Sequence, residues 1–161
     1  VEIKNTDAEG RLILADALAY TEKTFTPACI IDLATLTGAI LRTFGEYVAG
    51  MMTTSPTYGA KLFAAGQRTH ERVWELPLYK DYEDEMKSDF ADVPNYGYFG
   101  RLAPYAGSIM GAIFLSYFVE KTPWIHVDIA GTAWAEKTRY YTYHGGTGFG
   151  VRLLVDFFQH L

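Results

Sequence analysis

Residues 28–34, Ala-Cys-Ile-Ile-Asp-Leu-Ala, form a nearly continuous apolar run with two β-branched residues. Runs of this kind are typical of a strand that is buried on both faces of a parallel sheet. The next residues, Thr35 to Gly38, predict a turn, and a short helix is expected to follow as far as Phe44. A buried strand that leads through a turn into a helix is typical of a layered α/β fold.

The segments on either side of this unit continue the alternation of strands and helices. Further strands are expected at 1–7, 47–53 and 124–130, helices at 11–25, 57–73, 79–88, 104–120 and 147–161, and long loops at 90–104 and 131–146. A chain of 161 residues suits one domain. We therefore expect an α/β fold with three layers, α/β/α, around a mostly parallel or mixed central sheet.

Composition and charge exclude several classes of function. The net charge is −5 and no run of Lys or Arg stands out, which argues against nucleic acid as a partner. The single cysteine, Cys29, lies in an apolar run and fits a reducing, cytoplasmic compartment. The uncharged stretch from Leu102 to Val119 reaches the length of a membrane span. Because it contains proline, glycines, serines and tyrosines, a buried helix without membrane contact is the better interpretation.

The pair Asp7-x-Glu9 is the first candidate for chemistry. In an extended strand, side chains two positions apart lie on the same face, and two carboxylates there can hold a divalent ion. Gly10 would permit a tight turn, and Arg11 would then stand beside the ion and stabilise an oxyanion. The alternative is a helix N-terminus that carries acidic residues because of its dipole. On these residues alone that alternative is favoured, because Asp-x-Glu arises by chance roughly 0.6 times per chain of this size.

The longer string Asn5-Thr6-Asp7-Ala8-Glu9-Gly10-Arg11-Leu12 resembles the signature of the leucyl aminopeptidase family, the cytosol aminopeptidases of peptidase family M17. Other segments resemble later parts of the family's catalytic domain in the same order: residues 32–39, 87–89, 92–95, 126–134 and 147–152. The resemblance covers nearly the whole chain. It implies that residues 1–161 are the C-terminal portion of that catalytic domain, without the family's N-terminal domain.

The resemblance implies a metal centre that cleaves peptides. Glu9 would bridge two divalent ions, Mn²⁺ or Zn²⁺, and Asp7 would bind one of them. Arg11 would hold a bicarbonate ion that helps to deprotonate the attacking water. The expected substrates are peptides whose N-terminal residue, preferably leucine-like, is released.

Five further residues match the family's substrate-binding positions. Thr35, Leu36 and Gly38 match the loop that aligns the substrate backbone. Ala130 and Ala133 match positions that line the pocket for the first side chain, which is mostly apolar.

The chain departs from the family pattern before the signature. The family's site also needs a lysine, two aspartates and a catalytic lysine from upstream segments, whereas here the signature begins at residue 5. We therefore expect the intact parent, as a homo-oligomer that is hexameric in the family, to be the enzyme, and this chain alone to be inactive. The alternative is a non-catalytic assembly or binding module. The reading frame upstream of Val1 would separate the two.

Three other features have simpler interpretations. His126 and Asp128 alternate on one predicted strand and could suggest a ligand pair, but a structural histidine near the sheet edge is favoured. Ser108 lies in a segment that only partly matches a nucleophile elbow and is expected within a helix. The aromatic loop at 95–104 is bulkier than the family pattern, and we expect it to reshape the rim of the substrate pocket.

Overall fold

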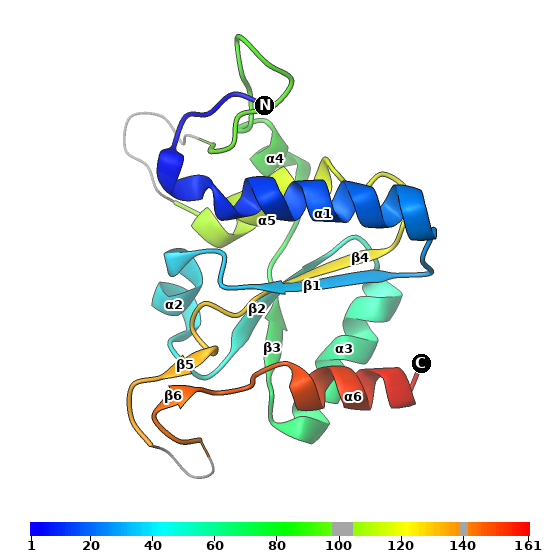
Figure 1. Cartoon of the computed structure of the whole chain (residues 1–161), viewed down its shortest axis with the longest axis vertical. Helices are drawn as coiled ribbons and strands as arrows, with labels where there is room; N and C mark the ends of the chain where they lie inside the picture. Colours follow the sequence, from blue (N-terminus) through cyan, green and yellow to red (C-terminus); the bar gives the residue numbers. More distant parts are fainter. Residues whose placement is uncertain (98–104, 139–141) are drawn as a thin grey trace.

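The central sheet of the computed structural model, which describes residues 1–97, 105–138 and 142–161, has four strands (Figure 1). Their spatial order is β1 (Ile30–Ala34), β4 (Trp124–Asp128), β2 (Ala49–Thr53) and β3 (Val73–Glu75). β1 is parallel to β4 and β2 is parallel to β3, whereas β2 and β4 are antiparallel. The predicted mostly parallel or mixed sheet is confirmed, and the apolar run at 28–34 supplies one of its strands.

Helices cover both faces of this sheet, as Figure 1 shows from the side. On one face lie α1 (Gly10–Phe25) and α5 (Gly107–Ser116), and on the other lie α3 (Pro56–Thr69) and α6 (Val151–Gln159). The remaining elements are short: η1 (Thr6–Ala8), α2 (Gly38–Phe44), α4 (Lys80–Glu83), and a ribbon of β5 (Trp134–Ala135) and β6 (Gly145–Gly146). The three-layer α/β/α architecture is confirmed.

Strand β4 separates two buried clusters. Successive side chains of a strand point to opposite faces, and all five residues of β4 are buried. Trp124 belongs to the cluster beneath α1 and α5, whereas Ile125 and Val127 belong to the cluster over α3 and α6. His126 and Asp128 therefore lie on the same side of the sheet as Trp124, which is the side that faces α1 and α5.

The expected helix at 57–73 is shorter than predicted. It ends at Thr69, where His70 adopts a left-handed backbone with φ of 59°. The chain can then turn and add β3, beginning at Val73, to the edge of the sheet. The expected helix at 79–88 is also shorter, because only Lys80–Glu83 are helical.

The N-terminal strand predicted at 1–7 does not form. Glu2 makes one isolated bridge to Pro94, and the chain then turns into the 3₁₀ helix η1. The helix expected at 104–120 is described from Gly107 to Ser116. Residues 98–104, which include most of the expected aromatic loop and the expected first residue of that helix, lie outside the described part of the chain. None of the helices formed by the described residues has the length and apolar character needed to cross a membrane.

Glu22 anchors the far end of α1 to the connection between α5 and β4. Its carboxylate accepts hydrogen bonds from the backbone N–H groups of Glu120, Lys121 and Thr122 at 2.7–2.9 Å. These bonds, that from Glu120 above all, lower the pKa of Glu22 from 4.5 to about 2 against the opposing effect of burial. Because the ionised form is favoured in the folded protein, Glu22 stabilises the fold fully above pH 4.5.

We expect this contribution to be lost as the pH falls from 4.5 toward 2. Glu22→Gln should lower the free energy of unfolding at pH 6 by about 1–2 kcal/mol, a figure reduced for partial solvent screening. Urea unfolding at pH 6, 4 and 3 should show a smaller pH dependence for Glu22→Gln than for the unaltered chain. Asp16→Asn, which changes an exposed carboxylate of the same helix, serves as the control. Parallel pH profiles for Glu22→Gln and the unaltered chain would contradict this account.

Candidate active site

Asp7, Glu9 and Arg11 line one pocket of about 410 Å³ together with Thr35 and Leu36. The sequence prediction that an extended strand would place the two carboxylates on one face is wrong. Asp7 lies in η1 and Glu9 is the N-cap residue of α1, so the backbone is helical at both positions. A tight helical turn, rather than strand alternation, brings the carboxylates to the same pocket, with both residues exposed to solvent.

The turn that follows them does not depend on glycine. Gly10 is the first residue of α1, and a side chain added there would meet nothing within 4 Å. Its backbone is not among the left-handed positions of the described chain. The expectation that Gly10 permits a turn forbidden to other residues is therefore wrong.

Arg11 is buried, with 5% of its surface exposed. Its Nη1 donates to the backbone carbonyl of Asn95 at 2.9 Å, and its guanidinium carbon lies 5.8 Å from the centre of the Tyr96 ring. Nε has no hydrogen-bond partner among the described residues. Burial lowers the pKa of Arg11, although Tyr96 and Asp128 oppose this effect. A buried cation with an unsatisfied donor is well suited to hold an anion.

Gly111 on α5 makes room for this guanidinium. A side chain carbon at position 111 would lie 3.1 Å from Leu36 Cδ2, 3.3 Å from Thr37 Cγ2 and 3.5 Å from Arg11 Nη2. Glycine at this position lets α5 approach both the arginine and the loop after β1 without displacing the neighbouring side chains. The packing of α5 thus helps to define the wall of the pocket.

Asp128, at the end of β4, ties together the loops that carry the predicted substrate residues. Its Oδ1 accepts from the backbone N–H groups of Leu36 at 3.1 Å, Thr37 at 3.4 Å and Ala130 at 3.2 Å. Its Oδ2 accepts from Thr37 Oγ1 at 2.6 Å, and that hydroxyl also lies 2.7 Å from Ser108 Oγ. Since Asp128 is fully buried, these bonds hold the loop after β1 in a fixed position against the loop after β4.

The other three predicted substrate residues do not line this pocket. Gly38 begins α2, and Ala130 is connected to Leu36 through Asp128. The carbonyl of Ala133 accepts from Thr147 N at 3.0 Å. The structure therefore brings two of the five substrate residues, Thr35 and Leu36, into the pocket with the carboxylates.

His126 is engaged within the core. Its Nδ1 lies 2.6 Å from Asp32 Oδ1, and Trp124 Nε1 donates to Asp32 Oδ2 at 2.7 Å. The expected position near the edge of the sheet is wrong, because β4 lies between β1 and β2. His126 and Asp128 share one side of the strand as predicted. They do not form a pair, because His126 contacts Asp32 and Asp128 accepts from backbone N–H groups of the two loops.

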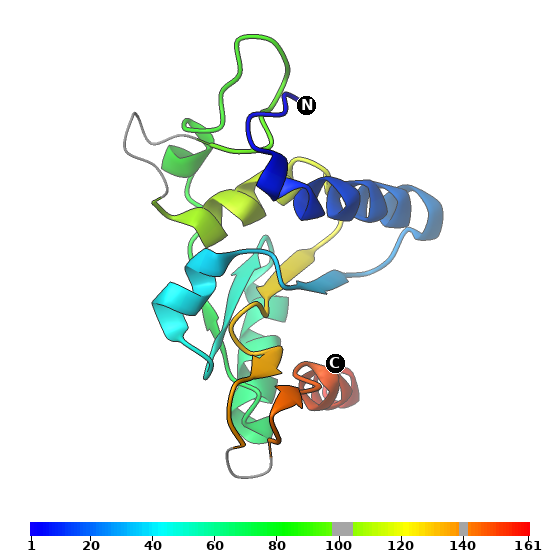
Figure 2. The ribbon, with the colours of Figure 1, turned by 60° about the vertical axis from the view of Figure 1, so that its left-hand side comes forward.

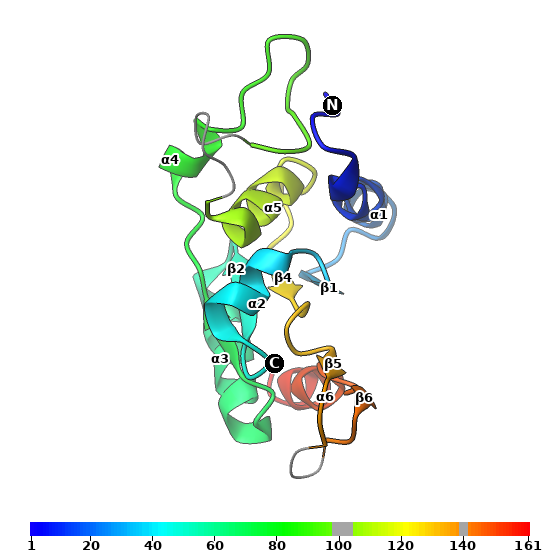
Figure 3. The same ribbon diagram turned by 90° about the vertical axis from the view of Figure 1, so that its left-hand side faces the viewer.

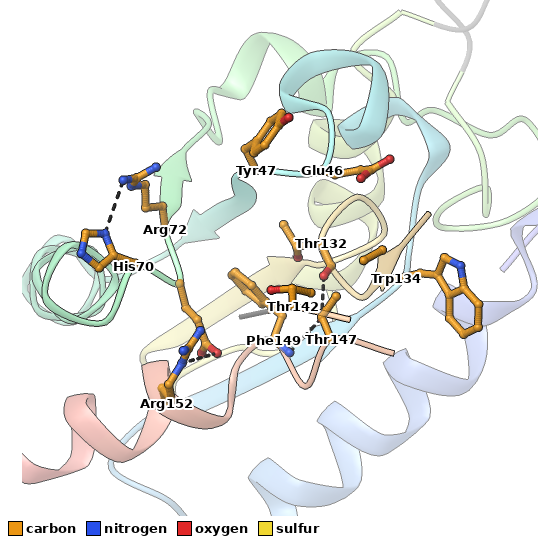
Figure 4. Close-up of a pocket in the computed structure, with 12 residues that line it drawn as sticks. Glu46, Tyr47, His70, Arg72, Thr132, Trp134, Thr142, Thr147, Phe149 and Arg152 are labelled. Atoms are coloured by element: carbon orange, nitrogen blue, oxygen red, sulfur yellow. Dashed lines mark hydrogen bonds and ion pairs between the residues drawn. The ribbon is translucent and has the colours of Figure 1, made fainter. Parts of the chain in front are cut away.

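A larger pocket, of about 600 Å³, lies around the β5–β6 ribbon and the start of α6 (Figure 4). Among its lining residues, Glu71 accepts from Arg152 Nε at 3.1 Å, and Thr147 Oγ1 donates to the carbonyl of Thr132 at 2.7 Å. None of the predicted metal, catalytic or substrate residues lines it. These two contacts join the start of α6 to the segment before β3, and the end of β6 to the segment before β5.

Two residues that shape the smaller pocket were not predicted as site residues. The sequence indicated Asp128 only as a possible partner of His126. An acidic residue at the end of a buried strand needs hydrogen-bond donors around it, and this was the signal for its wider role. Asn95 was noted only as part of a motif and of a bulky loop. It is fully buried and hydrogen-bonded to the segment that carries Asp7 and Glu9. No local pattern indicates a contact between residues about 90 positions apart.

Hard oxygen donors such as Asp7 and Glu9 suit a divalent ion, and the nearby guanidinium suits an accompanying anion. Within residues 1–97, 105–138 and 142–161, no group of three His, Cys, Asp or Glu side chains is placed to hold a metal ion. Asp7 and Glu9 by themselves therefore do not make a complete metal site.

Comparison with known proteins agrees with this arrangement. The model of the cytosol aminopeptidase family, catalytic domain, matches residues 1–155. A probable cytosol aminopeptidase of Geobacter sulfurreducens is 54% identical over 159 residues, which cover 99% of this chain and 31% of that protein. Similar proteins of Gloeobacter violaceus and Cenarchaeum symbiosum are each 50% identical over 98% of this chain and cover 30% and 32% of their own lengths. The chain thus spans about a third of the length of these relatives, and it belongs to the cytosol aminopeptidase family.

Proposed function

We propose that this chain contributes one wall of a two-metal aminopeptidase active site that releases N-terminal residues, preferably leucine-like, from peptides. The pocket that joins Asp7, Glu9 and Arg11 to Thr35 and Leu36 is the observation that carries the proposal. The matching family model is described as a catalytic domain, and the relatives are named probable cytosol aminopeptidases. The local chemistry and the family membership support the same activity.

In this proposal Glu9 would bridge two divalent ions, Mn²⁺ or Zn²⁺, and Asp7 would bind one of them. When bound, such ions polarise a carbonyl group and make water a nucleophile near neutral pH. Arg11 would hold a bicarbonate ion, which its buried positive charge and its position in the lining of the pocket support. Its fixed positive charge would also stabilise the negative charge that develops on the carbonyl oxygen of the peptide.

Substrate would be aligned by the loop that follows β1. Thr35 and Leu36 line the pocket beside the carboxylates, and Gly38 continues the same loop into α2. Ala130 and Ala133 would border the first side chain of the peptide. For Ala130 the support is that its backbone N–H and that of Leu36 both donate to Asp128. Small apolar residues at these positions suit a leucine-like side chain.

The proposal includes a requirement for residues beyond this chain. Two carboxylates do not complete the ligand set of a dinuclear centre, so we expect residues 1–161 alone to be inactive. The enzyme would be the product of the whole reading frame that contains this chain, here named the full reading-frame product. We place it in the cytoplasm as a homo-oligomer, with the hexamer as the expected form.

Release of p-nitroaniline from leucine p-nitroanilide tests the proposal. The full reading-frame product should hydrolyse this substrate with Mn²⁺ or Zn²⁺ present, lose activity when a chelator removes the metal, and regain activity when metal is restored. Residues 1–161 alone should show no turnover under the same conditions.

Each possible result has a distinct meaning. Absence of hydrolysis by the metal-loaded full reading-frame product would contradict the aminopeptidase proposal and favour a non-catalytic assembly or binding module. Robust turnover by residues 1–161 alone would show that further ligands are not needed. Activity that survives complete metal removal would contradict the metal-dependent mechanism.

A further inference from the structure

We propose that Asn95 is a positioning residue that holds the segment with Asp7, Glu9 and Arg11 in the conformation that binds metal. This inference rests on the proposed function, and it assigns a role to a residue outside the predicted site. Asn95 is fully buried, although its side chain has both hydrogen-bond donors and an acceptor. The hydrogen-bond partners of its side chain and backbone lie 84–93 positions earlier in the chain.

The side-chain amide of Asn95 bonds to the motif with both of its ends. Oδ1 accepts from the backbone N–H groups of Lys4 at 2.9 Å and Asn5 at 3.2 Å. Nδ2 donates to the carbonyl of Asn5 at 2.7 Å and to that of Ala8 at 3.4 Å. These contacts lie on both sides of Asp7, so the amide spans the turn that carries the first carboxylate.

The backbone of Asn95 extends the same contact. Its N–H donates to the carbonyl of Glu2 at 2.8 Å, and its carbonyl accepts from Arg11 Nη1 at 2.9 Å. Asn95 therefore bonds to residues before Asp7, to residues on both sides of it, and to Arg11. Because a buried amide costs free energy unless it is hydrogen-bonded, this geometry is strongly preferred over alternatives that leave the amide unpaired.

The segment that leads to Asn95 runs alongside the N-terminal segment. Glu2 N donates to the carbonyl of Val93 at 2.9 Å, and Ser88 Oγ donates to the Glu2 carboxylate at 2.6 Å. Figures 2 and 3 show this part of the chain, in green, beside the blue N-terminal stretch and above α1 and α5. Residues 88–95 thus form a brace, and Asn95 is the part of the brace that contacts the metal motif.

Such a contact is expected to affect metal affinity. Asp7 and Glu9 are exposed, and neither is held by α1 packing alone, since one precedes the helix and the other caps it. Hydrogen-bonded groups behind metal ligands orient those ligands, and their loss costs about 10–100-fold in metal affinity. Asn95→Ala should therefore weaken Mn²⁺ binding by about 10–100-fold while leaving Asp7 and Glu9 in the chain.

The experiment uses Asn95→Ala with Glu22→Ala as the matched control. Glu22 also accepts backbone hydrogen bonds, which are exposed or partly buried, but at the opposite end of α1. Mn²⁺ affinity is measured on the full reading-frame product from the electron paramagnetic resonance signal of free Mn²⁺. Hydrogen exchange of residues 4–8 is measured separately on residues 1–161, where loss of the Asn95 amide should speed exchange of the Lys4 and Asn5 amides about tenfold.

The two measurements separate the inference from the function on which it rests. Weaker Mn²⁺ binding in Asn95→Ala, with unchanged binding in Glu22→Ala, supports the positioning role. Equal Mn²⁺ affinity in Asn95→Ala and the unaltered protein overturns it, whatever the change in stability. If the unaltered protein binds neither Mn²⁺ nor Zn²⁺, the proposed function fails. The exchange measurement then decides whether Asn95 holds the segment, and unchanged exchange at residues 4 and 5 overturns that role as well.

Discussion

Replacing Glu9 with glutamine in the full reading-frame product is expected to abolish both hydrolysis of leucine p-nitroanilide and tight binding of Mn²⁺. The amide keeps the size of the side chain but removes its charge and one of two equivalent oxygen ligands. A metal centre contributes several kcal/mol of charge stabilisation in the transition state, so we expect kcat/KM to fall about a thousandfold or more. Activity and bound metal should be lost together.

Glu46→Gln is the control for this experiment. Glu46 lines the larger pocket at the β5–β6 ribbon, so its substitution makes the same change of charge away from Asp7 and Arg11. We expect near-normal activity and metal content in that variant. Measurement of metal content and of initial rates on the same preparations separates loss of metal from loss of catalysis. Normal activity and metal content in Glu9→Gln would show that the motif has been assigned wrongly.

Asp128→Ala is expected to lower the free energy of unfolding by about 3–5 kcal/mol. The substitution removes the acceptor of the Leu36, Thr37 and Ala130 backbone N–H groups and of the Thr37 hydroxyl. Because Asp128 is fully buried, water does not readily replace the lost acceptor. The loops after β1 and β4 should then move apart, and the KM for leucine p-nitroanilide should rise in the full reading-frame product.

Asp128→Asn provides the conservative comparison. Its remaining oxygen can still accept from the three backbone N–H groups, while its amide can donate to the Thr37 hydroxyl. We expect it to recover more than half of the stability lost in Asp128→Ala and to restore KM. Urea unfolding and initial-rate kinetics measure the two effects. Equal loss of stability in the two variants would show that charge at Asp128, rather than its hydrogen-bond acceptors, stabilises the fold.

The fold was largely predictable because its information is local. Apolar runs marked β1 and β4, and helical periodicity marked α1 and α6, each to within a few residues. The three-residue strand β3 was missed because it is too short to show a period. The preceding helix, α3, ends where His70 adopts a left-handed backbone, and helical periodicity does not indicate where such a residue ends a helix.

The sequence named candidate site residues but not their geometry. Asp7, Glu9 and Arg11 of the signature line one pocket with Thr35 and Leu36, and their roles stay predictions. The expected strand at residues 1–7 was wrong because distant hydrogen bonds to Asn95 accompany a helical turn there. Pairings of this kind depend on how the completed fold brings distant segments together, and single-sequence patterns do not encode them.

The separation between the metal motif and its brace has a consequence for synthesis of the protein. Residues 5–11 leave the ribosome long before Asn95, which contributes the hydrogen bonds on both sides of Asp7. Contacts between such distant positions form only after a long loop has closed, and the entropy of that closure slows their formation. During translation the hydrogen bonds from Asn95 to this segment therefore cannot form until residue 95 has emerged. The conformation that we propose for metal binding is completed only after the motif itself has been translated.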